Sequence, residues 1–105
     1  MKRKDQSAGA SSRSVLIVDD DPAVRASLGL LLRQSGRKSM AARDPEEALK
    51  LLESRDFELV IEDLNFSRET SGREGLSLLR EIKRVRPRLP VILLTAWGSI
   101  ELAVE

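Results

Sequence analysis

The chain has 105 residues, of which 41% are hydrophobic and 33% are charged, and its formal net charge is +1. This length predicts one small domain, and its core must be aliphatic because aromatic residues make up only 3%. The absence of cysteine and histidine excludes disulfides and thiolate or imidazole metal sites, so any bound metal must be held by oxygen ligands, as Mg²⁺, Mn²⁺ or Ca²⁺ are.

Residues 1–14 are predicted to be a disordered basic tail, and residues 15–105 a single domain. The tail is rich in Ser, Gly and Ala and carries four basic residues against one acidic residue. The rest of the chain is slightly acidic, and short basic termini are usually solvated, so we expect no direct contact with nucleic acid. No segment approaches the roughly 18 apolar residues of a membrane span, and no secretory signal is present. We therefore expect a cytoplasmic protein that does not bind a membrane.

The domain is predicted to begin with a buried strand at 15–19 and a helix directly after it. Asp21 is the expected N-cap of this helix, and Pro22 occupies its first position. Apolar residues recur at helical spacing until Gly36 ends the helix. A strand with poor β-propensity is predicted at 38–42.

The next helix has the clearest local signal. Asp44 is the expected N-cap, Pro45 takes the first position, and Glu47 lies three residues after the cap, as in a capping box. A strand is predicted at about 58–63, followed by a polar loop.

A third helix is predicted to end before Pro87 and a strand to follow at 90–95. The helix is expected to bury the face formed by Leu76, Leu79, Ile82 and Val85. Gly98 and Ser99 are expected to begin a fourth helix that the sequence end cuts off. Strands alternating with helices predict right-handed crossovers and an α/β fold with a doubly wound parallel sheet.

Acidic side chains follow two of the predicted strands. Asp19 and Asp20 come at the end of the first strand, and Asp63 at the end of the third. The carboxyl ends of neighbouring parallel strands lie about 4.8 Å apart at one edge of a sheet, so these carboxylates can share one divalent cation. Thr95 ends the fourth strand and could bond a phosphoryl oxygen. The sequence therefore predicts a Mg²⁺ and phosphoryl site at this edge.

The same residues also allow a purely structural interpretation. Asp20 and Asp21 could simply cap the first helix, and this interpretation is favoured for Asp21. Asp63 could be a loop aspartate, but its position beside an aspartate pair favours function. Asn65 could offer its backbone carbonyl to a metal or be an ordinary turn residue, and Thr95 could be an ordinary strand-end hydroxyl.

Three ordered segments together resemble the receiver domain of two-component response regulators: 15–22, 59–65 and 93–96. The resemblance implies the flavodoxin-like receiver fold with strand order 2-1-3-4. The loop at 65–72 and the final segment at 95–105 are similar to NtrC-like regulators, which join a receiver to an ATPase and a DNA-binding module.

The resemblance also implies a role for each site residue. Asp63 would be the phospho-accepting aspartate, and Thr95 the switch hydroxyl that turns toward the aspartyl phosphate. Asp19 and Asp20 would hold Mg²⁺ together with Asp63 and the Asn65 carbonyl. The phosphoryl donor would be a sensor histidine kinase, and the output, expected to be transcriptional, would lie in a longer protein. Such a domain is not an enzyme beyond accepting and slowly losing its own phosphoryl group.

The sequence departs from the receiver pattern in several places. It stops before the fifth strand and last helix, so the lysine and the aromatic switch residue of that strand are missing. Glu62 is charged where receivers have an apolar residue, and the following loop reaches Gly75 late and lacks the usual proline. Two other functions therefore stay open: a non-phosphorylated pseudo-receiver acting as an interaction module, and a magnesium phosphohydrolase of the haloacid-dehalogenase type. For the phosphohydrolase, the Asp19-x-Asp21 pattern lacks the Thr or Val expected after it.

A sheet without the fifth strand predicts an exposed apolar edge at 91–94. We therefore expect the isolated chain to be marginally stable, to self-associate through its fourth strand, or to be a fragment of a longer protein.

Overall fold

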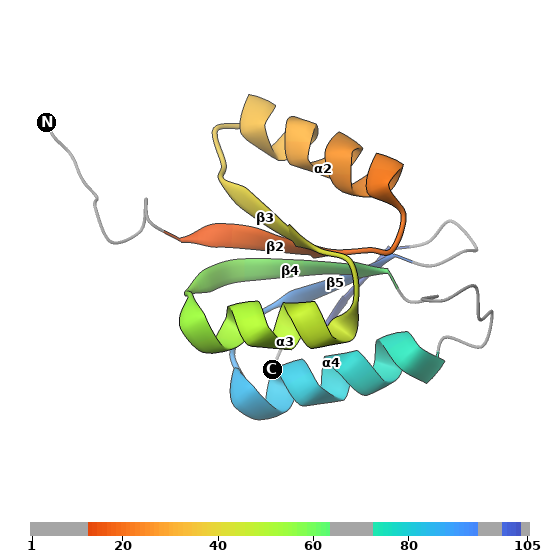
Figure 1. Cartoon of the computed structure of the whole chain (residues 1–105). Helices are drawn as coiled ribbons and strands as arrows, with labels where there is room; N and C mark the ends of the chain where they lie inside the picture. The colour runs from red at the N-terminus through yellow and green to blue at the C-terminus, as the bar shows by residue number, and fades with distance from the viewer. Residues whose placement is uncertain (1–12, 64–72, 95–99, 104–105) are drawn as a thin grey trace, which may run out of the picture.

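The computed structural model describes residues 13–63, 73–94 and 100–103, and only the backbone of 73–74 and 100–103 (Figure 1). Its elements, in chain order, are β2 (Ser14–Val18), α2 (Pro22–Gln34), β3 (Ser39–Ala42), α3 (Pro45–Ser54), β4 (Phe57–Asp63), α4 (Arg73–Val85), β5 (Val91–Leu94) and β6 (Ile100–Ala103). Residues 1–12 of the predicted tail lie outside these ranges. Ser14 already belongs to β2, so the sheet begins one residue earlier than predicted.

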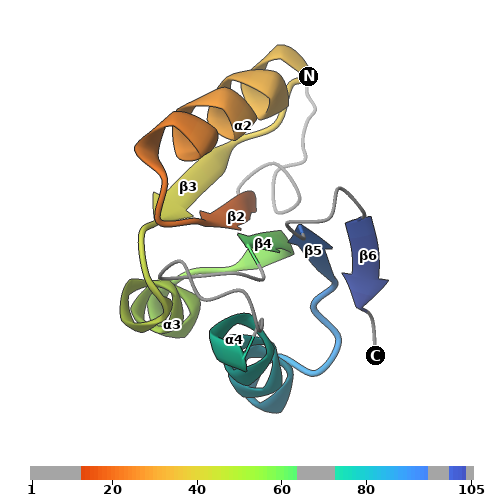
Figure 2. The same ribbon diagram turned by 90° about the vertical axis from the view of Figure 1, so that its right-hand side faces the viewer.

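The five strands form one sheet in the order β3-β2-β4-β5-β6. The first four in this order are parallel, which confirms the predicted order 2-1-3-4. Helix α2 covers one face of the sheet, whereas α3 and α4 lie side by side on the other (Figures 1 and 2). The doubly wound α/β prediction is therefore confirmed.

The predicted fourth helix and the predicted free edge are both wrong. Residues 100–103 form β6, which pairs antiparallel with β5 from Leu94↔Ile100 to Val91↔Ala103. Ile100, Glu101 and Leu102 alternate between apolar and polar, the pattern of a strand, and an isolated helix this short gains little in water. Because β6 satisfies the backbone groups of β5, the structure offers no free β5 edge for self-association.

The larger core lies between the sheet and the pair α3 and α4. Leu52, Leu78 and Ile82 of these helices are buried against sheet residues that are themselves fully or almost fully buried: Leu16, Val18, Val60, Val91 and Leu93. Two of the four residues predicted to form the buried face of α4 are exposed instead: Leu76 is 40% exposed and Val85 is 38% exposed. The buried face instead follows Leu78 and Ile82, which are one helical turn apart, with Leu79 packed beside them.

The smaller core lies under α2 and consists mainly of sheet side chains. Val15, Ile17 and Ile61 are at most 9% exposed, but no residue of α2 is buried. Leu30 and Leu31 of α2 are 53% and 59% exposed. This helix is therefore held mainly by its ends and by the half-buried side chains between them.

Local sequence signals fix both ends of α2. The Asp21 side chain accepts a hydrogen bond from the Ala23 N–H at 2.9 Å, as expected of an N-cap. At the other end Gly36 has φ 80°, a conformation that glycine adopts without strain. The Arg37 N–H donates to the Leu32 carbonyl at 2.8 Å and closes the helix end. The chain can then reverse directly into β3.

The N-terminus of α3 is capped by Asp44 as predicted. Its side chain accepts from the Glu47 N–H at 2.8 Å. The Glu47 side chain accepts from the Arg43 N–H at 2.9 Å, so the return bond of the capping box reaches one residue beyond the cap.

We expect Asp44→Ala to lower the free energy of unfolding by about 1 kcal/mol, because the Glu47 N–H then loses its partner at the helix end. Urea unfolding followed by circular dichroism measures this. Asp56→Ala, an exposed aspartate that caps no described helix, is the matched control. Equal losses in the two variants would contradict the capping role.

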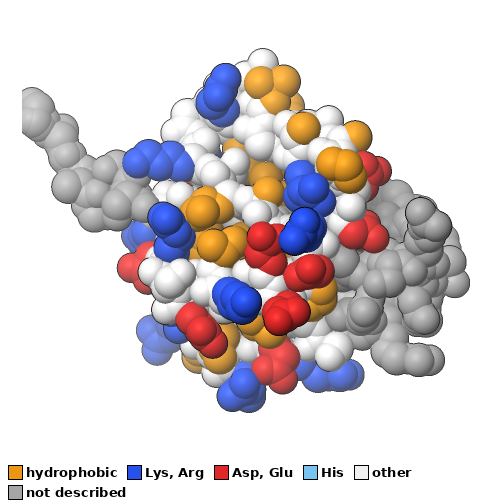
Figure 3. All heavy atoms as spheres, viewed as in Figure 1, with side chains coloured by type: hydrophobic (Ala, Val, Ile, Leu, Met, Phe, Trp, Pro, Cys, Tyr) orange, Lys and Arg blue, Asp and Glu red, His pale blue; other side chains and the backbone are white. Residues whose placement is uncertain are grey.

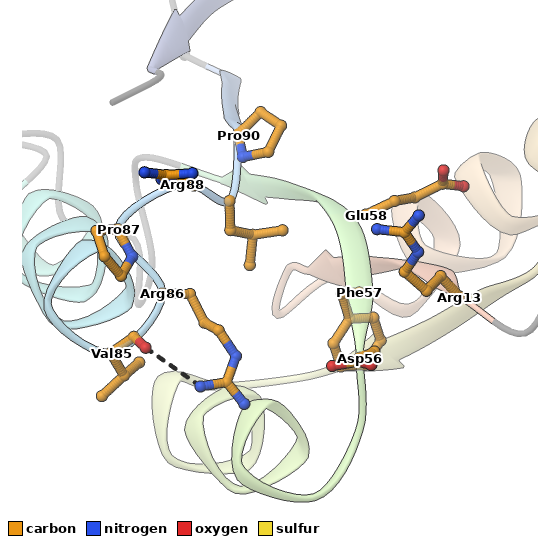
Figure 4. A pocket seen from close by; sticks show the side chains of 10 residues that line it. Arg13, Asp56, Phe57, Glu58, Val85, Arg86, Pro87, Arg88 and Pro90 are labelled. Atoms are coloured by element: carbon orange, nitrogen blue, oxygen red, sulfur yellow. Dashed lines mark hydrogen bonds between the residues drawn. The ribbon is translucent and has the colours of Figure 1, made fainter. Parts of the chain in front are cut away.

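Side-chain bonds tie the loop between α4 and β5 to the rest of the domain. Arg86 donates to the Leu52 carbonyl at 2.7 Å and to the Val85 carbonyl at 3.2 Å, and Lys83 donates to the Leu89 carbonyl at 2.9 Å. A cavity of about 400 Å³ lies beside these bonds, at the amino ends of the strands (Figure 4).

Among the described residues, no helix is both long and apolar enough to cross a membrane.

Candidate metal and phosphoryl site

The candidate site lies where β2 and β4 end, at the carboxyl edge of the sheet. Asp19 directly follows β2, and Asp63 is the last residue of β4. The parallel register pairs Val18 with Glu62, so the next residue on each strand, Asp19 and Asp63, lies at the same level. The predicted convergence of these two strand ends is therefore present.

Three carboxylates meet at this edge. Asp19, Asp20 and Asp63 each offer an oxygen, and these three oxygens lie within 4.8 Å of one another. Asp19 is buried, Asp63 half-buried and Asp20 exposed, so the group opens from the sheet edge toward solvent. An all-oxygen, anionic donor set of this size fits Mg²⁺, which takes one or two carboxylates from the protein and keeps other positions for water or phosphate.

The electrostatics of Asp19 are those expected inside such a cluster. Burial raises the pKa of Asp19 above its ordinary value. The neighbouring charges of Asp63, Asp20 and Asp21 raise this pKa further, while the hydrogen bond from the Asp21 N–H, at 2.9 Å, lowers it. A bound divalent cation would offset this mutual repulsion, which is the physical reason to expect one here.

Arg25 supports the loop that carries the aspartates, and sequence reasoning missed it. Its guanidinium donates to the Asp19 backbone carbonyl at 2.8 Å. The Asp19 N–H in turn donates to the Ala42 carbonyl of β3 at 3.1 Å. The sequence signal that could have predicted this contact was the position of Arg25 in the first turns of α2. Side chains of a helix lean toward its N-terminus, so an arginine there can reach the preceding loop.

Glu62 precedes Asp63 but points to the opposite face of the sheet, because side chains alternate along a strand. It is fully buried among the side chains around Val18 and Leu93, its neighbours in register. Neither carboxyl oxygen has a hydrogen-bond partner within the described part of the chain. Burial, followed by the charge of Asp63, raises the pKa of Glu62 to about 8. This pKa favours the protonated form of Glu62 at neutral pH.

The structure brings together three of the five predicted site residues: Asp19, Asp20 and Asp63. Asn65 and Thr95 lie outside the described residues, so their roles stay predictions. Asp21 caps α2, the interpretation favoured from sequence.

We expect Asp20→Asn to weaken Mg²⁺ binding on the order of tenfold or more, because it removes a charged oxygen from the cluster. A Mg²⁺ titration monitored by the fluorescence of Trp97, the only tryptophan, measures the midpoint. Asp56→Asn, at the opposite edge of the sheet, should leave it unchanged. An unchanged midpoint in Asp20→Asn would show that the site is misplaced.

Comparison with known proteins agrees with the fold. The family model of the response regulator receiver domain matches residues 15–105. The chain is 41% identical over 90 residues to the transcriptional regulatory protein GlrR of Escherichia coli, covering 86% of this chain and 19% of GlrR. It is 41% identical over 91 residues to the response regulator FleR of Pseudomonas aeruginosa, covering 87% of this chain and 18% of FleR. The chain thus spans about a fifth of the length of these curated relatives.

Solved receiver structures share its fold. The response regulator TrrA of Thermotoga maritima, solved in complex with Mg²⁺ and BeF, superposes with a TM-score of 0.70 at 34% identity, over 80% of this chain and 70% of TrrA. In a complex of TrrA with the histidine kinase ThkA, the TM-score is 0.72 at 33% identity, over 83% of this chain and 72% of the matched chain. The chain belongs to the response regulator receiver domain family of two-component systems.

Proposed function

We propose that this receiver domain accepts a phosphoryl group onto Asp63 from a sensor histidine kinase, in a Mg²⁺-dependent reaction. The observation that carries the proposal is the cluster of Asp63 with Asp19 and Asp20, whose oxygens lie within 4.8 Å of one another. Asp63 is the member of the cluster at the end of a central strand, where a carboxylate can serve as a nucleophile beside the other two.

In the proposed reaction, a carboxylate oxygen of Asp63 attacks the phosphorus of a phosphohistidine. The new P–O bond forms as the P–N bond breaks, and the imidazole leaves with the electron pair of that bond. Mg²⁺ bound by the aspartates supplies positive charge to the phosphoryl oxygens. The domain itself contributes positioning, with Asp19 held by its burial and by its backbone bonds to Arg25 and Ala42.

Two further roles belong to this proposal. The Asn65 backbone carbonyl completes the Mg²⁺ ligands, and the Thr95 hydroxyl bonds the acyl phosphate and reports it to the surrounding surface. The similar regulators are named transcriptional regulatory proteins, and TrrA forms a complex with a histidine kinase. We accordingly propose a cytoplasmic protein with a sensor histidine kinase as donor and a transcriptional output, through ATPase and DNA-binding domains of a longer protein.

One observation favours the alternative of a pseudo-receiver that only binds partners. The described residues include three lysines, and none is placed to contact a phosphoryl group at the acidic site. Lys83 bonds the Leu89 carbonyl, Lys38 precedes β3 at the amino edge, and Lys50 is exposed on α3. The alternative would give a domain that binds Mg²⁺ but forms no acyl phosphate.

Incubation with Mg²⁺ and acetyl phosphate separates the candidate functions. The proposal expects one phosphoryl group per chain, removed by hydroxylamine and absent when EDTA is added. A chain that binds Mg²⁺ but gains no mass would be a pseudo-receiver. Release of many phosphate equivalents per chain from phosphate esters would instead indicate a phosphohydrolase.

A further inference from the structure

A basic pocket of about 610 Å³ opens at the amino edge of the sheet, opposite the acidic site. Its polar lining, which defines the basic pocket below, consists of Ser14, Arg33, Arg37, Lys38, Ser39 and Arg55. Lys and Arg side chains gather along the same edge in the space-filling view (Figure 3, left). The basic pocket shares no residue with the acidic cluster, so binding there does not require phosphorylation of Asp63.

Three separate segments deliver the cations to the basic pocket. Arg33 lies in the last turn of α2, and Arg37 and Lys38 follow the reversal at Gly36. Arg55 is the C-cap residue of α3. Because these segments meet only in the folded domain, the pocket is a product of the tertiary structure and not of a basic run in the sequence.

Most of this positive charge is not used within the described part of the chain. Arg37 pairs with Glu58 at 3.0 Å. The side chains of Arg33, Lys38 and Arg55 are exposed, and the described ranges contain no ion pair or side-chain hydrogen bond for them. The charged ends of these three residues are therefore available to an anion from solution.

The neighbouring cavity of about 400 Å³ differs in this respect (Figure 4). Its Arg86 is already engaged with the Leu52 and Val85 carbonyls. Asp56 and Glu58 also contribute carboxylates to its lining. An anion should therefore prefer the basic pocket, whose lining contains no acidic residue.

Gly29 is one of the residues that line the basic pocket. It lies in the middle of α2, where glycine costs roughly 0.5–1 kcal/mol relative to alanine. A Cβ added there would lie 3.6 Å from the Ser39 Oγ, an ordinary contact, so close packing does not require the glycine. A long side chain at this position would instead extend into the pocket.

We propose that the basic pocket binds a small molecule that carries two or more linked phosphoryl groups. Guanidinium groups match phosphate oxygens in a two-pronged geometry, and the Ser14 and Ser39 hydroxyls add donors. The three cations that are not ion-paired, Arg33, Lys38 and Arg55, exceed what one phosphate neutralises, whereas a di- or triphosphate can engage all three. The volume also lies in the range of about 300–1,000 Å³ typical of small-molecule sites.

Calorimetric titration of the full chain with inorganic tripolyphosphate, at low salt and with EDTA, tests this. We expect Arg33→Gln/Arg55→Gln to weaken binding at least tenfold. The control Lys50→Gln/Arg80→Gln, which removes the same charge from exposed sites on α3 and α4, should change it less than twofold. Gly29→Met, which fills the pocket without changing charge, should also weaken binding several-fold. Asp63→Asn should bind as the wild type does, which separates this result from phosphorylation.

Each contrary outcome overturns the proposal. The first is no measurable binding of tripolyphosphate to the wild type. The second is an equal loss of affinity in the pocket and control double variants, since this would show that net charge alone attracts the ligand. Orthophosphate binding as tightly as tripolyphosphate would exclude a ligand with linked phosphoryl groups. A DNA duplex that binds more tightly than tripolyphosphate and depends on the same arginines would make the pocket a nucleic-acid contact. Circular dichroism of each variant verifies that it is folded.

Discussion

Replacing Glu62 with methionine is expected to raise the free energy of unfolding at pH 7 by several kcal/mol. The wild-type domain buries this side chain completely, with no hydrogen-bond partner in the described ranges. A buried polar group without a partner costs roughly 1–3 kcal/mol. Keeping the carboxyl protonated at pH 7 costs more, because its ordinary pKa is 4.5. Methionine is unbranched and of similar size, so it removes both costs with little change of shape.

The stability of the wild type should also depend on pH because of Glu62. Its pKa is about 8 in the folded domain and near 4.5 when unfolded. The folded state therefore holds a proton that the unfolded state loses between these values. The contribution of this group is fully present below about pH 4.5, is lost as the pH rises toward about 8, and changes little above that. At about 1.4 kcal/mol for each pKa unit, the loss amounts to a few kcal/mol.

Urea unfolding at several pH values between 5 and 8.5 measures both effects. Glu62→Gln is the matched control, since it removes the titration but keeps a polar group in the core. In Glu62→Gln, the pH dependence that the wild type owes to Glu62 should be absent. This variant should also gain less stability than Glu62→Met, because its amide is still a buried polar group. If the free energy of unfolding changes with pH by the same amount in the wild type and in both variants, Glu62 is not a buried, protonated group.

Asp63→Asn is expected to abolish labelling by acetyl phosphate, because it removes the proposed nucleophile. It should also weaken Mg²⁺ binding, since Asp63 is one of the three clustered carboxylates. Intact-mass spectrometry after labelling measures the first effect. Thr95→Ala should retain the phosphoryl group but reduce the change in Trp97 fluorescence that accompanies it. A phosphoryl adduct of undiminished yield in Asp63→Asn would exclude Asp63 as the acceptor.

The parts of this fold that sequence predicted well are those fixed by local signals. Asp21 and Asp44 cap their helices through bonds to N–H groups only two or three residues away. The runs at 15–18 and 91–94 have the aliphatic composition of strands buried on both faces. The acidic cluster followed from the same logic, because the carboxyl ends of adjacent parallel strands meet at one edge.

The parts that sequence predicted poorly depend on distant partners. The pairing of β6 with β5 joins segments through backbone bonds that composition does not reveal, and a four-residue segment carries little periodicity. The buried face of α4 was displaced toward Leu78 because α3 and the sheet, and not the helix alone, select which side is covered. The burial of Glu62 is likewise set by Val18 and Leu93 on the neighbouring strands.

The most direct test of the proposed function is to locate the phosphoryl group after phosphorylation. Reduction of the labelled chain with borohydride converts a phosphorylated aspartate to homoserine, which peptide mass spectrometry assigns to one position. The proposed function predicts homoserine at residue 63 only, in Mg²⁺-treated samples and not in those with EDTA. Homoserine at another aspartate, or its absence from a folded chain that binds Mg²⁺, would contradict it.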